Sequence, residues 1–351
     1  MTNRSPHTTK SASDVREVDA IFRLAGLVRN RRAGQLRSPR PRREGETPEE
    51  LAPLKPVPVL ASNGLPLLRI SAWRKLPWLW HAFTTRKGGV SRVYCAEGEP
   101  GELNLGFTAS DDRALVEENR RQLAEAVTGD PATQLVTVRQ FHSNLLIKSP
   151  GHSIQSGYPR KGDGLMTAQA GVLLAIQTAD CIPVLVADRK QRVVAAFHAG
   201  WRGTVSRIVE SGIGKMRLEF NANPKDLVAA IGPGICACCY AIGEEVFSAF
   251  ESQFSYAGEL FHEVYDTDAV RQKYPMLFLT QRAPGHSPIG PSLHLDLIEA
   301  NRRQLLDAGV PKGAIHVAGG CTNCHPDLFF SHRRSQGHAG RMMSVIGIRP
   351  E

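Results

Sequence analysis

The sequence predicts an α+β domain built around a mixed β-sheet. Apolar runs of strand length alternate with segments of helical period along the chain, and there is no internal repeat. The runs at 172–176, 182–187 and 193–198 follow one another closely enough for hairpins, whereas the later strands are separated by helices. Hairpins combined with strand–helix–strand stretches are typical of α+β proteins. The 351 residues, 42% of them apolar, supply enough material for one large core.

Each predicted element has its own signal. Continuous apolar runs predict strands at 79–85, 172–176, 182–187, 193–198, 227–231, 314–318 and 343–348. Spacings of three and four between apolar residues predict helices at 112–127, 204–220, 243–254 and 295–307. The last helix ends at Gly309, just before Pro311. Residues 86–89 form a glycine-containing turn, and 283–290 is expected to be a surface loop.

Most of the positive charge is confined to the N-terminal segment. The net charge is +9, yet the first 43 residues hold 11 basic and 3 acidic side chains, which leaves +1 for the rest. We therefore expect residues 1–55 to be a disordered arginine-rich arm and linker, and 56–351 to be the folded domain. Nucleic acid is not an expected partner, unless this arm binds it or another anionic surface. A transit peptide is disfavoured by the acidic residues within the first 20.

The remaining composition predicts a cytoplasmic enzyme. The chain contains no run of 18 apolar residues and its first residues lead into no apolar signal region, so we expect no membrane association. Seven cysteines are an odd number, which suits a reducing compartment better than a disulfide framework. The composition leaves open whether the chain is a monomer or a homodimer.

Three soft metal ligands follow apolar runs in distant parts of the chain. His142, Cys181 and His198 are separated by 39 and 17 residues. Structural zinc sites take paired ligands from tight turns, whereas catalytic zinc takes three protein ligands and keeps a fourth position open. The spacing therefore favours an enzyme site. A cysteine at the mouth of an apolar strand is also a common packing residue, so Cys181 alone would indicate little.

Six short motifs occur in a fixed order: 83–91 (FTTRKGGVS), 177–183 (QTADCIP), 198–203 (HAGWRG), 231–240 (IGPGICACCY), 329–333 (FFSHR) and 340–342 (GRM). On these motifs the chain resembles the multicopper polyphenol oxidase (laccase-domain) family, whose members are read as purine nucleoside phosphorylases with adenosine deaminase activity. The resemblance extends from about residue 58 to residue 348. It implies one compact sandwich of mixed sheets flanked by helices.

The resemblance also implies a chemistry. It implies a zinc enzyme, with copper as the alternative metal, whose substrates are phosphate and the purine nucleosides adenosine, inosine and 5′-methylthioadenosine, and which also deaminates adenosine. The metal ligands would be His142, Cys181 and His198. The catalytic residues would be Cys181, His198, Asp180 and Arg202. Substrate or phosphate would bind Arg86, Arg202, Arg333 and Asp163.

These roles have physical reasons as well as simpler alternatives. Arg202 lies at the start of a predicted helix, where free N–H groups favour an anion, but a single arginine is usually a surface residue. Asp163 and Asp180 are candidates to orient the histidines or to transfer protons.

Other functions remain open from the sequence alone. A copper-dependent phenol oxidase is one, although the chain has no His-x-His pair. A thiol hydrolase with Cys181 as nucleophile and His198 as base is another, and a scaffold recruited through the arm is a third. Residues 321–325 match a c-type haem pattern. Cys236, Cys238, Cys239, Cys321 and Cys324 are either a structural zinc site or small residues in turns.

Overall fold

The computed structural model describes residues 47–149, 160–265, 273 and 291–351, all within one compact unit, Pro41–Glu351. Most of the predicted arm and the loop predicted at 283–290 lie outside the described residues. The domain boundary at 55/56 therefore stays a prediction. In the described part, no helix is both long and apolar enough to cross a membrane.

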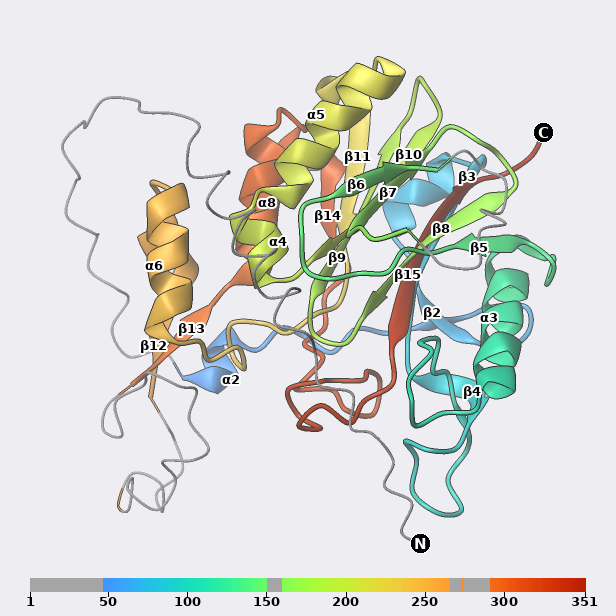
Figure 1. Cartoon of the computed structure of the whole chain (residues 1–351), viewed down its shortest axis with the longest axis horizontal. Coiled ribbons are helices and arrows are strands. Elements are labelled where there is room, and N and C mark those ends of the chain that lie inside the picture. The colour runs from blue at the N-terminus through green and yellow to red at the C-terminus, as the bar shows by residue number, and fades with distance from the viewer. Residues whose placement is uncertain (1–46, 150–159, 266–272, 274–290) are drawn as a thin grey trace, which may run out of the picture. The chain divides into compact units, whose positions relative to one another are not determined.

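Two six-stranded mixed sheets form the centre of the fold (Figure 1). The first has the order β1 (Val59–Leu60), β2 (Pro66–Leu68), β3 (Leu79–Thr84), β15 (Met342–Ile348), β8 (Val172–Thr178), β5 (Gln134–Val136). The second has the order β14 (Ile315–Val317), β11 (Leu227–Ile231), β9 (Ile182–Asp188), β10 (Val193–Ala199), β7 (Gly164–Thr167), β6 (Leu146–Lys148). Neighbouring strands are antiparallel except for the pairs β5–β8, β6–β7 and β11–β14.

Smaller elements complete the described part. β12 (Phe261–Val264) and β13 (Ser292–Leu295) form a separate antiparallel pair, and β4 (Lys87–Ser91) contacts Glu102 through isolated bridges. The α-helices are α2 (Pro48–Leu51), α3 (Arg113–Thr128), α4 (Trp201–Val205), α5 (Ile208–Phe220), α6 (Glu244–Gln253) and α8 (Leu297–Asp307). Short 3-10 helices lie at Ser71–Lys75, Pro224–Asp226, Ala257–Leu260 and Lys312–Ala314.

The two sheets pack face to face. Leu174 of β8 and Ile346 of β15 share one buried cluster with Leu185 of β9 and Ala196 of β10, which come from the other sheet. Helix α3 covers the outer face of the first sheet, and α5 and α8 cover that of the second (Figure 1). Apolar residues on both faces of the central strands explain why those strands read as continuous apolar runs. The predicted sandwich of mixed sheets flanked by helices is confirmed.

Some predicted elements differ in detail. The helix predicted at 204–220 is two helices, because Arg207 adopts a left-handed conformation (φ 58°) between α4 and α5. The runs at 172–176 and 182–187 do not form a hairpin, since β8 and β9 belong to different sheets. The helix predicted from 295 begins two residues later, because Leu295 is the last residue of β13. The turn predicted at 86–89 is mostly strand, because residues 87–89 belong to β4 and only residues 85 and 86 separate it from β3.

Candidate metal and substrate site

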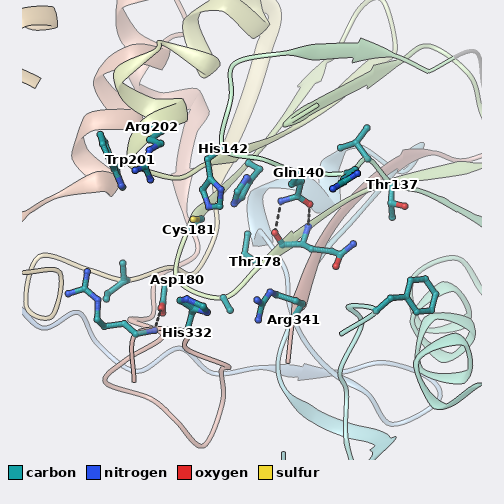
Figure 2. A pocket seen from close by; sticks show the side chains of 18 of the residues that line it. Thr137, Gln140, His142, Thr178, Asp180, Cys181, Trp201, Arg202, His332 and Arg341 are labelled. Atoms are coloured by element: carbon teal, nitrogen blue, oxygen red, sulfur yellow. Dashed lines mark hydrogen bonds between the residues drawn. The ribbon is translucent and has the colours of Figure 1, made fainter. Parts of the chain in front are cut away.

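His142, Cys181 and His198 converge in space. Their possible ligand atoms, one from each side chain, all lie within 4.8 Å of one another. Cys181 lies in the short connection between β8 and β9, and His198 is near the end of β10, opposite Pro183 of β9. The sequence context of His142 suggested that it ends a strand. It does not, because β5 stops six residues earlier at Val136. Figure 2 shows His142 directly beside Cys181 at the pocket wall.

One buried carboxylate organises this arrangement. Asp163, which is fully buried just before β7, accepts hydrogen bonds from the backbone N–H groups of Phe141, His142 and Ser143 and from the Ser143 hydroxyl. It also pairs with Nδ1 of His198 at 2.8 Å, which leaves Nε2 of that ring to face another group. Asp163 therefore orients two of the three ligands. It does not line the pocket, so the geometry gives it no direct contact with a substrate.

The backbone around the ligands is constrained. His142 (φ 66°) and Asp180 (φ 98°) occupy the left-handed region that side chains rarely adopt. The Gln140 side chain exchanges two hydrogen bonds of 2.8 Å with the backbone of Gln177, which fastens the loop to β8 (Figure 2). A Cβ at Gly200 would lie 2.8 Å from Sγ of Cys181, so only glycine fits there. Strained residues held by their surroundings are characteristic of functional sites.

The electrostatics favour an ionised cysteine. Burial opposes ionisation, but the charge of His198 and hydrogen bonds from His142 and His198 lower the pKa of the Cys181 thiol to about 6. Burial likewise opposes the charge on His198, but Cys181 and Asp163 raise its pKa to about 9. A thiolate beside two imidazoles, one of them oriented by a carboxylate, is a suitable donor set for a soft divalent metal. The three residues therefore fit a metal ion with one position left open.

The ligands lie in the wall of a cavity of about 890 Å³. Six arginines line it: Arg113, Arg120, Arg139, Arg202, Arg333 and Arg341. Asp180 is the only acidic residue among the described residues that line it. The aromatic residues Phe107, Trp201 and Tyr240 also line it. Such a cavity suits a ligand that carries both negative charge and a flat ring.

Two of the predicted phosphate-binding arginines reach this cavity. Arg202 is exposed at the start of α4, with its guanidinium 4.3 Å from the centre of the Trp201 ring. The Arg333 guanidinium donates to the Ala241 carbonyl at 2.8 Å and lies 5.2 Å from the centre of the Tyr240 ring. Figure 2 shows Arg202 and Trp201 on one side of the pocket and Arg341 on the other.

The structure does not bring Arg86 to the cavity. Its guanidinium forms a largely buried ion pair with Glu102 at 2.6 Å and donates to the Pro326 and Tyr94 carbonyls. Arg86 therefore holds loops together, and its charge is already compensated. This arrangement gives no support to phosphate binding by Arg86.

Asp180 lines the cavity next to Cys181. One carboxylate oxygen accepts from the Thr322 hydroxyl at 2.6 Å and the other from the backbone N–H of Arg333 at 2.7 Å. Each oxygen keeps a further lone pair, so the carboxylate can still accept a proton or a ligand hydrogen bond.

Several lining residues were not anticipated. Arg113 and Arg120 belong to the charged face of α3, which in sequence reads as a solvent-exposed surface. Trp201 and Tyr240 lie inside the family motifs, but nothing in those motifs indicates that they face the ligands. Gln140 precedes His142 by two residues, and this proximity was the only available signal.

The fold and site together define a two-sheet domain with a Cys/His₂ set that could hold a metal ion in an arginine-lined cavity. The chain belongs to the multi-copper polyphenol oxidoreductase laccase family, whose model matches residues 80–349. It is 39% identical to a purine nucleoside phosphorylase of Deinococcus radiodurans over 82% of this chain and 95% of that one. It is 31% identical to adenosine deaminase RL5 of an unknown prokaryotic organism, over 76% and 92% of the two chains.

A solved structure of similar fold is also known. YlmD from Geobacillus stearothermophilus superimposes with a TM-score of 0.65 at 32% identity, covering 84% of this chain and all of that one. The predicted family and the prediction that the chain is an enzyme of this family are confirmed by these matches.

Proposed function

We propose that this protein is a zinc-dependent purine nucleoside phosphorylase that acts on adenosine, inosine and 5′-methylthioadenosine and also deaminates adenosine. One observation carries the proposal: His142, Cys181 and His198 meet in the wall of a cavity lined by six arginines and three aromatic rings. The names of the relatives, purine nucleoside phosphorylase and adenosine deaminase, support the same substrate class.

The three ligands would hold the zinc ion. Zinc in such a site acts as a Lewis acid and lowers the pKa of a bound water molecule towards neutrality, which is the chemistry that deamination at C6 of a purine requires. The protein's own contribution is orientation. Asp163 fixes the His198 ring through Nδ1 and fixes the His142 backbone through its N–H group. Both ligands are therefore placed before any substrate arrives.

The arginines would hold phosphate for phosphorolysis. Neither an ion pair nor a side-chain hydrogen bond to another described residue engages Arg202, so its guanidinium can donate two parallel hydrogen bonds to a phosphate. Arg333 is anchored through Ala241 and Asp180 and would present its remaining N–H groups. A buried dianion needs such partners because its desolvation is costly.

The rest of the cavity would recognise the nucleoside. Trp201 and Tyr240 offer ring faces against which a purine can stack. Burial raises the pKa of the Tyr240 hydroxyl, so it stays protonated and can donate a hydrogen bond. Asp180, at the cavity edge beside Cys181, is our candidate for moving a proton to or from the substrate.

Two variants separate the metal from the anion site. Cys181→Ala removes a thiolate ligand, so zinc content, phosphorolysis and deamination should fall together. Arg202→Ala should keep the zinc and raise the apparent dissociation constant for phosphate roughly ten- to a hundredfold, the equivalent of about 1.5–3 kcal/mol. Deamination, which uses no phosphate, should change less. The measurements are metal analysis and parallel kinetics of inosine phosphorolysis and adenosine deamination.

A matched control is Arg217→Ala, an exposed arginine on α5 outside this cavity. It should change neither reaction. Equal losses of both reactions in Arg202→Ala would contradict its assignment to phosphate. Copper bound at this site, together with phenol oxidation, would favour the alternative oxidase.

One observation favours a second candidate function, that of a cysteine hydrolase. Asp163, His198 and Cys181 form a chain of contacts like the orienting acid, base and nucleophile of a cysteine hydrolase. His142 at the same thiol argues for a metal instead, because such a hydrolase needs only one histidine there. Purified protein that lacks metal and loses activity on alkylation of Cys181 would select the hydrolase.

A further inference from the structure

Four cysteines that the proposed function does not use lie together outside the cavity. Sulfur atoms of Cys238, Cys239, Cys321 and Cys324 all lie within 4.8 Å of one another, so the group can hold a metal ion. Sγ of Cys324 is 3.5 Å from that of Cys238 and 3.4 Å from that of Cys239. All four are free thiols. We call this group the four-cysteine cluster.

We propose that the four-cysteine cluster binds a structural zinc ion, separate from the zinc proposed in the cavity. Zinc bound by four thiolates with bonds of about 2.3 Å places the sulfur atoms about 3.8 Å apart. The observed separations therefore need only small adjustments to close on the ion. Cys321 and Cys324 have the Cys-x-x-Cys spacing of structural zinc sites, and the adjacent Cys238 and Cys239 supply the other two sulfur atoms from a second turn.

The sheet topology explains why these residues meet although more than 80 positions separate them. Cys238 and Cys239 lie in the segment after β11, and Cys321 and Cys324 lie in the segment after β14. Because β11 and β14 are parallel neighbours, both segments leave the sheet at the same end. A bridge between Gly234 and Cys321 continues the pairing beyond the strands.

The surroundings fit thiolate ligands better than four packing residues. The backbone N–H of Cys236 points to Sγ of Cys321 at 3.5 Å, a contact that stabilises negative charge on sulfur. The thiol of Cys236 is directed to the Gly234 carbonyl and also contacts Cys321, but it is not one of the four sulfur atoms that all lie within 4.8 Å of one another. Leu51 and Ile298 pack against the group, in which Cys238 and Cys321 are buried and Cys239 and Cys324 are partly exposed. Four thiols used only as small apolar groups would have no reason to face one another.

The zinc ion would stabilise the edge of the catalytic cavity. Thr322, between two of the ligands, donates its hydroxyl to Asp180, and Tyr240 follows Cys239 directly. Both Asp180 and Tyr240 line the cavity. Cross-linking the two turns by zinc therefore fixes groups on which substrate binding depends, although the ion itself lies outside the reaction.

The test counts zinc in the full-length protein. Wild type should carry two zinc ions per chain, and a His142→Ala/Cys181→Ala double variant should keep one. X-ray absorption of the zinc in this double variant should show four sulfur ligands at about 2.3 Å. Because the double variant lacks the proposed catalytic site, failure of the proposed function would not affect this result.

Single variants then assign the ligands. In the background of the double variant, Cys324→Ser should lose the remaining zinc and lower the melting temperature. Cys324→His should retain it, since three cysteines and one histidine also bind zinc. Cys236→Ser, the neighbouring cysteine outside the cluster, should retain it as well.

Three results would overturn the proposal. The first is a double variant free of zinc whose four thiols react at once with a thiol reagent. The second is a disulfide among the four cysteines, found by mass spectrometry. The third is iron in place of zinc in the protein as purified.

Discussion

At the residue scale, a few small contacts determine whether the three proposed ligands can meet. Asp163 brings the His142 loop and the His198 ring to one carboxylate, although the three residues come from separate segments. Gly200 leaves room for them on the opposite side, because a Cβ there would lie 2.8 Å from Sγ of Cys181 and 2.9 Å from Cδ2 of His142. The site should therefore be sensitive to added volume as well as to lost ligands.

Replacing Gly200 by alanine tests this sensitivity. The new methyl group would push the Cys181 and His142 side chains away from each other. Overpacking of this kind costs about 1–3 kcal/mol, which should weaken zinc binding roughly ten- to a hundredfold. Competition with a chelator measures the affinity. Gly214→Ala, at a helix position with open space around the new Cβ, should leave zinc affinity unchanged. Equal zinc affinity in Gly200→Ala and wild type would show that the ligands meet differently.

A buried histidine away from the site gives stability a pH dependence. His81 accepts a hydrogen bond from the backbone N–H of Ile70, and its ring packs edge-on against Trp73. Burial, together with the nearby charge of Arg69, lowers its pKa to about 3, so it stays neutral in the folded protein. In the unfolded chain a histidine takes up a proton below about pH 6.5. The contribution of the neutral His81 to the free energy of unfolding is therefore present above pH 6.5 and is lost as the pH falls towards 3.

Comparison with His81→Gln, which cannot titrate in this range, isolates the effect. Between pH 7.5 and 5.5 the free energy of unfolding of wild type should fall by about 1.4 kcal/mol more than that of the variant. Urea unfolding at the two pH values gives the difference. Parallel losses in both proteins would mean that His81 is protonated in the folded state.

At the element scale, helix α3 carries cavity residues and depends on its N-terminal cap. Asp112 accepts a hydrogen bond from the backbone N–H of Ala114 at 2.7 Å, and Arg113 and Arg120 of the same helix reach the cavity. Asp112→Ala should lower the free energy of unfolding by about 1 kcal/mol, because the first-turn N–H loses its partner. Asp112→Asn keeps an acceptor and should remain within a few tenths of a kcal/mol of wild type. Urea unfolding of both variants measures the free energy of unfolding. An equal loss of stability in the two would show that the negative charge of Asp112 matters and the hydrogen bond does not.

The central strands were predictable and the marginal ones were not. Residues 227–231 form β11 with the predicted bounds, because a strand covered on both faces is apolar throughout. β4 contains two glycines and one large apolar residue, and β6 has only three residues at the edge of the second sheet, so neither leaves such a signal. The break at Arg207 leaves no local signal, because arginine is a good helix former and its type does not indicate the left-handed conformation that it adopts.

The candidate site was predictable in its parts but not in its arrangement. Chemistry-bearing residues such as Cys181 and His198 stand out against the apolar strands beside them. Which arginine faces the cavity depends on contacts between distant segments, and Arg86 pairs with Glu102 instead. The meeting of Cys238 with Cys324 likewise depends on β11 and β14 being parallel neighbours, which no local pattern specifies.

At the scale of the whole molecule, the extent of the folded domain can be tested by truncation. The described structure begins at Thr47, which caps α2, and Leu51 of that helix packs against the four-cysteine cluster. Lys55 forms an ion pair with Asp327. These contacts lie within the segment predicted to be an arm and linker.

Deleting residues 1–46 should therefore leave the melting temperature and nucleoside turnover unchanged, because this segment is too rich in charge and too poor in apolar residues to add to a core. Deleting residues 1–55 also removes Leu51 and Lys55, and should lower the melting temperature. An insoluble or inactive protein after the shorter deletion would place the domain boundary further towards the N-terminus.

The connection from β8 to β9 passes from one sheet to the other within three residues, 179–181, and carries both Asp180 and Cys181. Its length is fixed by the separation of the two sheets, so an inserted residue would displace the thiol from the two histidines. A change in chain length at this crossing would therefore disturb the packing of the two sheets and the meeting of the proposed metal ligands together.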